Sequence, residues 1–418
     1  MKKLSILLAL SLLLAACSNS GSSGTKITVT TEDSLGGPAA VIAMAYQVGD
    51  GGWQPVYPDE SGAYSFYVPQ GETRYGVAVR CGVGLEFGNY SSNTVYQLTT
   101  EESTSPLVSC LGTGRFTVVG GDVDVSSVTG ATRFEVFGGM ESDYENGTAD
   151  HYSVNVAHNT GADMVVMAFD ASYNAVAARI VRNLGAGSGT VSKDVTLTNA
   201  DALGSFATPA FSVPAGWSGY CGNTLVTAGG TYVSEDMASG NAAGCTFRSV
   251  ANAGAGDLYM LGAGASDPSD SYQIAQVRMV DVTQTASVTL TPSIEPYSSF
   301  SFTLDPLPAL PITHPDPGVK LYQVVLFSPY NYWIYQVSSA WLGDADHYYP
   351  PNLDDVVGFE GLIPESGDQA MIYVAAIKTA TDVADFFNKP HVPGLLPLPR
   401  GAGQVFDLAM YGKDYQVP

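Results

Sequence analysis

The chain has 418 residues, a formal net charge of −23 and only 14% charged residues, whereas about 25% is usual for soluble globular proteins. Its acidic balance and lack of a basic patch argue against nucleic acid and anionic lipid headgroups as partners. The length suggests two to four domains rather than one compact core. Plentiful Gly, Ser, Thr, Val and Tyr are typical of extracellular all-β modules.

The first residues have the pattern of an export signal. Lys2 and Lys3 precede an apolar stretch from Leu4 to Ala16, which is too short to cross a bilayer core of about 30 Å as a helix. Residues 1–16 are therefore predicted to be a signal peptide, and its removal with two lysines would take the formal charge from −23 to −25. The Ser- and Gly-rich segment 17–25 is predicted to be a flexible tether.

The run Leu14-Ala15-Ala16-Cys17 resembles the lipobox of bacterial lipoprotein precursors. The resemblance implies cleavage before Cys17, a diacylglycerol on its thiol and an acyl chain such as palmitate on its new amino group. It places the mature protein at a bacterial cell membrane through a lipid anchor. Ser18 favours the outer membrane if the organism is Gram-negative, because an aspartate there favours inner-membrane retention. An ordinary secretory signal with a chance cysteine is the alternative.

Four cysteines follow Cys17, and an even number behind an export signal favours disulfides. Each sequence-local pair lies within one apparent module, so we predict the bonds Cys81–Cys110 and Cys221–Cys245 among three formal pairings. Each would close a loop of about 25 to 30 residues, which stabilises by roughly 3 to 4 kcal/mol in the chain-entropy relation. Neither CxxC spacing nor a nearby histidine supports metal ligation instead.

A weak internal repeat organises the chain. Gly161–Asp201 and Gly254–Ser293 both run from an acidic turn into an apolar strand, and both leave along an alternating Val-Thr-Leu-Thr strand, at Val195–Thr198 and Val288–Thr291. A repeat of this period is typical of tandem domains. The prediction is four β-sandwich units, the last with an aromatic-rich insertion, at residues 26–112, 113–202, 203–294 and 295–418.

Strand signals dominate every unit. Tyr64–Val68 and Arg115–Val119 are rich in β-branched and aromatic residues, and Gly- and Asp-rich turns separate such segments. The clearest helical signal is a short turn at Asp382–Asn388. The predicted fold class is all-β, with tandem antiparallel β-sandwich domains. Gly62–Pro69, followed by Gly76–Val79, resembles transthyretin-like or carboxypeptidase-regulatory-like modules, which implies an Ig-like sandwich with an accessory or structural role.

One acidic segment of the second unit could hold a cation. Glu141, Asp143, Glu145 and Asp150 could supply several oxygens to Ca²⁺ from a loop. Their spacing is neither that of an EF-hand nor that of the nonapeptide calcium repeat, and most acidic loops are merely solvated. A structural calcium ion stays open as an alternative, and no other cofactor is predicted.

The densest aromatic region lies within residues 330–360. Trp333 and Trp341 accompany Asp344, Asp346 and His347 there, and flat aromatic faces beside carboxylates are what a carbohydrate-binding platform requires. Alternation along a sandwich strand nevertheless directs every second aromatic side chain into the core. Core packing with ordinary rim residues is therefore the favoured interpretation, with a ligand platform as the competing one.

The sequence lacks HExxH, a Walker A motif, GxGxxG after a strand and a GxSxG elbow. We therefore predict a membrane-anchored lipoprotein that is not an enzyme, exposed at the surface or in the periplasm, with a structural, adhesion or protein-interaction role. Its partners would be the membrane and envelope proteins or glycans. The alternative is a carbohydrate-binding or polysaccharide-acting lipoprotein that uses residues 330–360, with carboxylates such as Asp354 and Glu360 as acid and base.

Overall fold

The structure is a computed structural model that describes residues 24–33, 36–82, 91–110, 116–139, 141–159, 161–185, 189–282, 288–298, 300, 302–305, 307–328, 331–392 and 397–417. Cys17 and the predicted signal peptide lie outside these residues. The last two residues of the predicted tether are described, and they open strand β1 (Gly24–Glu32). Within the described ranges, no helix has the length and apolar character needed to cross a membrane.

The predicted all-β class is confirmed. In the described part of the chain, helical structure is confined to α2 (Ser339–Leu342), α3 (Val383–Asn388) and the short 3-10 turn η2 (Asn199–Asp201). The helical turn expected at Asp382–Asn388 is also confirmed, since it is α3. Asp382 caps this helix by accepting a hydrogen bond from the Ala384 N–H.

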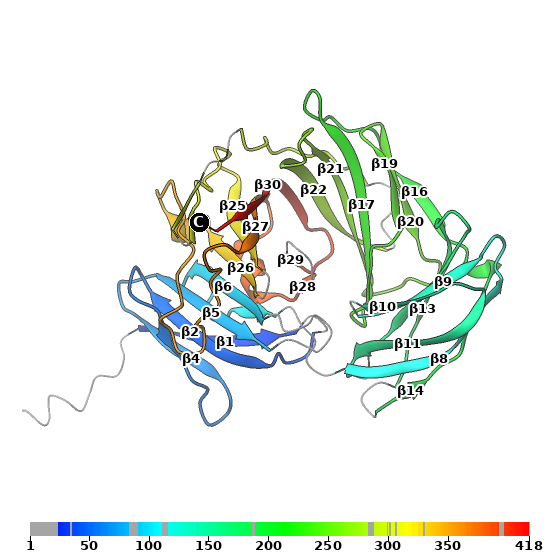
Figure 1. Cartoon of the computed structure of the whole chain (residues 1–418), viewed down its shortest axis with the longest axis horizontal. Coiled ribbons are helices and arrows are strands. Elements are labelled where there is room, and N and C mark those ends of the chain that lie inside the picture. The colour runs from blue at the N-terminus through cyan, green and yellow to red at the C-terminus, as the bar shows by residue number, and fades with distance from the viewer. Residues whose placement is uncertain are drawn as a thin grey trace, which may run out of the picture.

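The largest sheet has twelve strands and draws them from the first, third and fourth predicted units. In spatial order the strands are β18 (Tyr232–Val233), β17 (Ser218–Val226), β21 (Leu258–Ser266), β22 (Tyr272–Asp281), β30 (Val405–Gln416), β27 (Gln369–Thr379), β25 (Val319–Phe327), β26 (Asn331–Ser338), β6 (Ser91–Thr99), β5 (Arg74–Cys81), β2 (Val41–Val48) and β3 (Gln54–Pro55). The units meet where β22 pairs antiparallel with β30 and where β6 pairs parallel with β26, two strands that lie side by side in Figure 1. Backbone hydrogen bonds therefore cross the boundaries predicted between the units. The division into four units stays a prediction.

The other described strands form smaller sheets. Strand β1 pairs with β4 (Tyr64–Pro69) and β7 (Leu107–Ser109). The second unit is a sandwich of two sheets around one apolar core. Its strands are β10 (Glu141–Glu145), β9 (Arg133–Gly138), β12 (Met164–Phe169) and β13 (Ala175–Val181) in one sheet, and β11 (Ala149–Ala157), β8 (Phe116–Ser127), β14 (Val191–Ser192) and β15 (Val195–Thr198) in the other. The remaining sheets are β16 (Gly204–Ala207), β20 (Gly244–Ser249) and β19 (Ala238–Asn241); β23 (Thr303–Asp305) and β24 (Leu307–Ala309); β28 (His391–Val392) and β29 (Leu398–Pro399).

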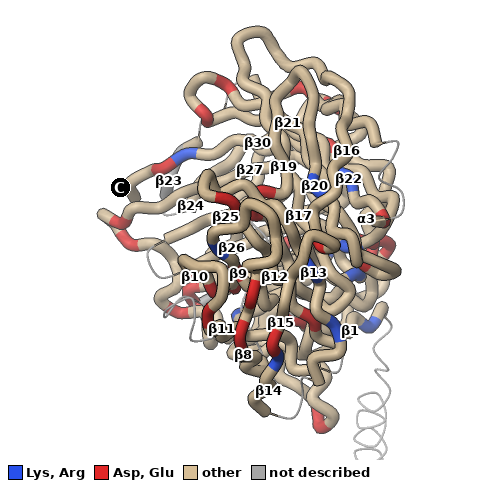
Figure 2. Tube along the Cα trace, turned by 90° about the vertical axis from the view of Figure 1, so that its right-hand side faces the viewer, with Lys and Arg blue, Asp and Glu red and all other residues tan. Residues whose placement is uncertain are grey.

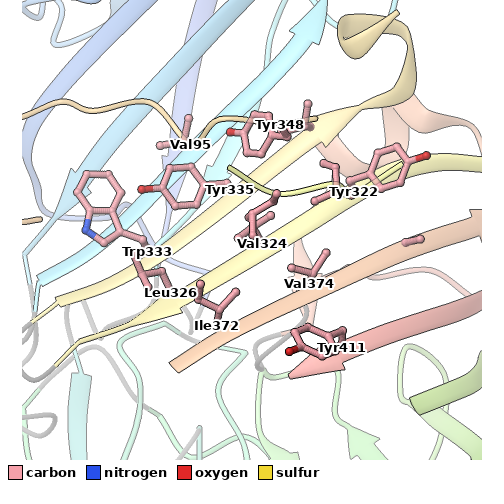
Figure 3. Packing of buried hydrophobic residues seen from close by; sticks show 14 of the residues in the cluster. Val95, Tyr322, Val324, Leu326, Trp333, Tyr335, Tyr348, Ile372, Val374 and Tyr411 are labelled. Atoms are coloured by element: carbon pink, nitrogen blue, oxygen red, sulfur yellow. The ribbon is translucent and has the colours of Figure 1, made fainter. Parts of the chain in front are cut away.

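Apolar clusters cover both faces of the twelve-stranded sheet. Alternate residues of β25 point to opposite sides, so that Val324 and Leu326 join one cluster and Leu321 joins another. The first cluster contains Trp333 and Val374 from neighbouring strands (Figure 3). Central strands covered in this way need apolar residues in both registers, which explains why the sequence of β25 is a nearly continuous apolar run.

The second Val-Thr-Leu-Thr segment is not a strand, in contrast to the prediction. Val195–Thr198 forms β15, but Val288–Thr291 has no ladder partner among the described strands. Its Thr291 N–H donates to Oε1 of Gln276, and its carbonyl accepts from Nε2 of the same amide, both at 2.9 Å. A side chain thus satisfies backbone groups that a neighbouring strand would bond, although Val288 and Leu290 are buried.

Both predicted disulfides are present, Cys81–Cys110 and Cys221–Cys245, each with a Cα–Cα distance of 5.8 Å. Cys81 ends β5 in the twelve-stranded sheet, and Cys110 follows β7 in the sheet of β1. The first bond therefore ties together the two sheets of the first unit. The second bond ties β17 to β20 in the same manner.

Candidate functional site

Trp333 lies in the core. All eight residues of β26 are buried, and the Trp333 side chain is only 1% exposed. Its ring lies parallel to that of Tyr335 with centroids 5.6 Å apart (Figure 3), and its Nε1 donates to the Leu362 carbonyl at 3.2 Å. Because β26 is an interior strand with apolar side chains on both faces, a dissolved ligand cannot reach this ring. The predicted place of Trp333 on a ligand platform is therefore not supported.

Trp341 connects the fourth unit to the first. It lies in α2, where the Ser338 hydroxyl accepts a hydrogen bond from its backbone N–H at 3.1 Å. The Arg74 guanidinium carbon lies 5.8 Å from the half-buried ring, within cation–π range, and Arg74 also pairs with Asp50 at 2.6 Å. The Trp341 Nε1 is buried without a hydrogen-bond partner in the described residues.

Asp344, Asp346 and His347 follow α2 and are exposed. Nδ1 of His347 lies 2.9 Å from Oδ1 of Asp346, and this hydrogen bond lowers the pKa of the Asp346 carboxyl. The three residues share one exposed segment with Trp341, whereas Trp333 is separated from them by its burial. A ligand site on the four exposed or half-buried residues stays a prediction.

The calcium candidates lie on two strands and not in a loop. Glu141, Asp143 and Glu145 alternate along β10 and are half-buried, whereas Asp150 lies at the start of β11. Oε2 of Glu141 accepts from the Asn155 amide at 2.8 Å, and Oδ2 of Asp143 accepts from the Ser153 N–H at 2.6 Å. The described residues contain no group of three or more His, Cys, Asp or Glu side chains placed to hold a metal ion.

Asp354 and Glu360, the carboxylates considered as acid and base, both bond backbone groups of one exposed turn. Oδ1 of Asp354 accepts from the Gly361 N–H at 2.6 Å, and Oε2 of Glu360 accepts from the Gly358 N–H at 2.8 Å. These contacts give both side chains a role in holding the turn.

An ionic network that sequence reasoning missed joins the second and third units. Arg182, directly after β13, pairs with Asp163 at 3.5 Å and with Asp257, whose side chains are 1% and 0% exposed. The Thr227 hydroxyl donates to Asp163 at 2.6 Å, and the Ala228 N–H donates to Asp257 at 2.8 Å. All four carboxylate oxygens accept hydrogen bonds within the chain, so the network is a structural junction.

A second polar chain, also missed, joins the first and fourth units. Ser109 Oγ lies 2.8 Å from Oε1 of Glu32 and 2.9 Å from Nδ1 of the buried His391. Nε2 of His391 faces the Phe386 carbonyl at 2.9 Å, so Nε2 carries the proton of the neutral ring. Burial lowers the pKa of His391 to about 4 and raises the pKa of Glu32. The carboxylate contacts the serine and not the imidazole, unlike the acid of a nucleophilic triad.

A pocket of about 620 Å³ lies between the turn after β1 and the end of β11. Asp33, Gly37 and Pro38 line one side, and His158 and Asn159 line the other. Its polar side chains take part in local hydrogen bonds, Asp33 with the Gly37 N–H at 2.8 Å and His158 with a threonine hydroxyl at 2.8 Å. The described lining residues therefore come from two predicted units and do not form a recognisable catalytic set.

Three side chains that contact one another at the surface, Arg133, Tyr144 and Tyr173, form what we call the tyrosine cluster. Tyr173 and Tyr144 are 60% and 36% exposed, and their rings stack at a centroid distance of 6.4 Å with 20° between planes. The Arg133 guanidinium lies 3.5 Å from the Tyr173 centroid and donates to the Tyr144 hydroxyl at 3.0 Å. Sequence reasoning missed this cluster because the two tyrosines are 29 residues apart and only strand pairing brings them together.

Comparisons with known proteins add little to this picture. The sequence matches no family model and no curated protein. Among solved structures, the chain is similar to the Bacillus anthracis TIE protein, with a TM-score of 0.16 and 10% identity, over 57% of this chain and 45% of that one. It is also similar to a streptococcal ancillary pilin, with a TM-score of 0.14 and 8% identity, over 64% of this chain and 98% of that one. The chain thus spans less than half the length of the first of these structures.

Proposed function

We propose that this protein is a lipid-anchored, non-catalytic component of a bacterial cell envelope, with a structural, adhesion or interaction role. The observation that carries the proposal is the short spacing between Cys17 and β1. Residues 18–23 separate Cys17 from Gly24, and seven Cα–Cα steps span at most about 25 Å. Acyl chains on Cys17 would therefore hold the first strand close to a bilayer surface.

The continuity of the β body supports a role in display. The parallel pair β6 and β26, the Cys81–Cys110 bond and the Arg182 junction each connect different predicted units or sheets. A force or a binding partner that acts on one unit would therefore also act on the rest of the β body, because hydrogen bonds, an ion pair and a disulfide connect its units and sheets. Such a body suits an envelope component that contacts proteins or glycans.

Three further features favour this role over that of a polysaccharide-acting enzyme. Asp354 and Glu360 are engaged in one turn, and Trp333 is buried. Asp and Glu residues recur on many elements and basic residues are few (Figure 2), which suits a solubilising surface charge. The likeness of Gly62–Val79 to transthyretin-like modules is part of this proposal, as an accessory domain near the anchor.

Fatty-acid labelling of the full chain in its own host tests the anchor. Alkyne-palmitate should label the wild type and leave Cys17→Ser unlabelled, and Cys17→Ser should leave the membrane fraction. Unlabelled wild type, or labelling that persists in Cys17→Ser, would overturn the anchor. In a Gram-negative host, Ser18→Asp is the matched control, since it should keep the label and move the protein from the outer to the inner membrane.

A further inference from the structure

We propose that the tyrosine cluster, Arg133, Tyr144 and Tyr173, is a binding site for an uncharged, pyranose-containing polysaccharide. This site lies on the second unit, away from the aromatic region of residues 330–360. The inference rests on the interaction role proposed above and makes that role more specific. It names the ligand class and the side chains that would contact it.

The cluster is ordered before any ligand arrives. Arg133 begins β9 and Tyr144 lies in the neighbouring β10, while Tyr173 lies in the turn between β12 and β13. The Tyr144 hydroxyl accepts from Arg133 at 3.0 Å and donates to Oδ1 of Asn146 at 2.9 Å. These bonds hold the Tyr144 ring, and the Arg133 guanidinium over its face holds the Tyr173 ring, so little side-chain freedom remains to be lost on binding.

The backbone at Tyr173 is unfavourable for a tyrosine. Three turns share one construction, in which a carboxylate accepts from the N–H groups two and four residues later; they begin at Asp59, Asp170 and Asp267. The residue three positions on has positive φ in each, +85° at Gly62, +64° at Tyr173 and +57° at Asp270. Glycine and aspartate tolerate this conformation, whereas a bulky side chain is a steric outlier. Conformational outliers of this kind concentrate at functional sites, and Tyr173 places its ring in solvent.

One carboxylate lies across the strand pair from Tyr144. Glu135 stands opposite Tyr144 in the register of β9 and β10, and it is on the same side of β9 as Arg133 because strand side chains alternate. Burial raises the pKa of Glu135, while the Ser142 hydroxyl bonds it and the exposed Glu235 carboxylate lies near enough to act on it. Carboxylates can accept hydrogen bonds from sugar hydroxyls, and the negative face of an aromatic ring attracts the C–H face of a pyranose.

The dimensions of the cluster favour a sugar over a protein partner. In the described part of the chain, eight large hydrophobic side chains are exposed, and of these only Tyr144 and Tyr173 stack on each other. A stable protein interface covers about 800 Å² on each partner and has an apolar centre, which a pair of rings does not provide. The net charge of −23 disfavours polyanionic glycans, and the Arg133 guanidinium at the rings disfavours polycationic ones, so the ligand class is uncharged.

Gel retardation of the full chain in detergent tests the proposal, with laminarin, mannan or xyloglucan cast in native gels. At least one polysaccharide should retard the wild type, and Tyr173→Gly and Tyr144→Ala should each weaken the apparent affinity at least tenfold. Tyr173→Phe keeps the ring and should change the affinity less than threefold. Tyr57→Ala, which removes a tyrosine that is 69% exposed elsewhere, should change it less than twofold.

Thermal melting of the same variants separates binding from structure. Glycine relieves the positive-φ conformation, so Tyr173→Gly should melt no lower than wild type. A lower melting temperature with unchanged retardation would assign Tyr173 a structural role and overturn the site. Retardation by none of the three polysaccharides, or only by the polyanion alginate, would also overturn it, as would a photocrosslink from position 173 to a protein without retardation. Failed labelling of Cys17 would overturn the anchor alone, because retardation of the purified chain needs no lipid.

Discussion

Arg182 and Asp257 form an ion pair that joins the end of β13 to the start of β21. The same guanidinium pairs with Asp163, which directly precedes β12. Asp163 and Asp257 thus occupy equivalent places in the internal repeat, each just before its first apolar strand. One arginine therefore serves both repeats, and the two hairpins pack face to face in one apolar cluster.

Replacing Arg182 by methionine should lower the free energy of unfolding by about 3 kcal/mol, because two buried carboxylates would lose their cation. Urea denaturation of the two chains measures the loss. Lys389→Ala is the control, since Lys389 pairs with Asp385 at 2.7 Å on a more exposed helix, and it should cost less than about 1 kcal/mol. Equal losses in the two variants would contradict a special role for the junction.

Stability should depend on pH through His391. Burial lowers the pKa of His391 from 6.5 to about 4, so the unfolded chain binds this proton at higher pH than the folded chain. The stabilisation is complete above pH 6.5 and is lost as pH falls towards 4, by roughly 3 kcal/mol in all. Denaturation curves across this range should show a decline in wild type that is absent from His391→Gln.

Glu32 titrates in the opposite sense and provides the control for His391. Its raised pKa means that the folded chain binds this proton more readily, so its contribution to stability falls as pH rises through the raised value. Glu32→Gln keeps an acceptor and a donor beside Ser109 but removes the opposing titration. The acid-side decline should therefore be steeper in Glu32→Gln than in wild type, and a shallower decline would contradict the assignment.

The disulfide between Cys81 and Cys110 should contribute about 3 to 4 kcal/mol, because it closes a loop with a sequence separation of 29. The double variant Cys81→Ala, Cys110→Ala should show this loss in urea denaturation. The equivalent variant of Cys221 and Cys245, with a separation of 24, should lose a similar amount. A loss below about 1 kcal/mol in either would mean that the unfolded chain is already restricted by other contacts.

The two tryptophans of the predicted platform should respond differently to truncation. Trp333→Ala removes a fully buried ring and its hydrogen bond to Leu362, and should cost about 3 to 5 kcal/mol. Trp341→Ala removes a half-buried ring at the edge of the same core and should cost less than half as much. Thermal denaturation compares them, and losses of equal size would argue against the different burial of the two rings.

Much of the local structure could be predicted from the sequence. Tyr64–Val68 falls within β4, the predicted strand Val195–Thr198 is β15, and the helical turn at Asp382 has its capping side chain. Alternation, turn residues and capping are properties of neighbouring residues, so they can be read without a fold. The disulfide pairs followed from the same locality.

The candidate sites could be predicted only in part. Trp333 and Trp341 lie eight residues apart in one aromatic-rich segment, yet one lies in an interior strand and the other in a short helix at the edge. Burial depends on which element covers a strand, and that information is not local. The tyrosine cluster and the Arg182 junction combine residues from different strands or units, so no spacing rule points to them.

The sequence by itself determined the all-β class, the turns and the disulfide pairs, because each depends on residues close together in the chain, and it predicts lipid attachment at Cys17. Only the tertiary structure decided that β6 pairs with β26, that Arg182 pairs with an aspartate of each repeat, and that Tyr144 stacks on Tyr173. Backbone hydrogen bonds are chemically alike for every strand, so the choice of partner strand comes from the packing of side chains on both faces of the sheet.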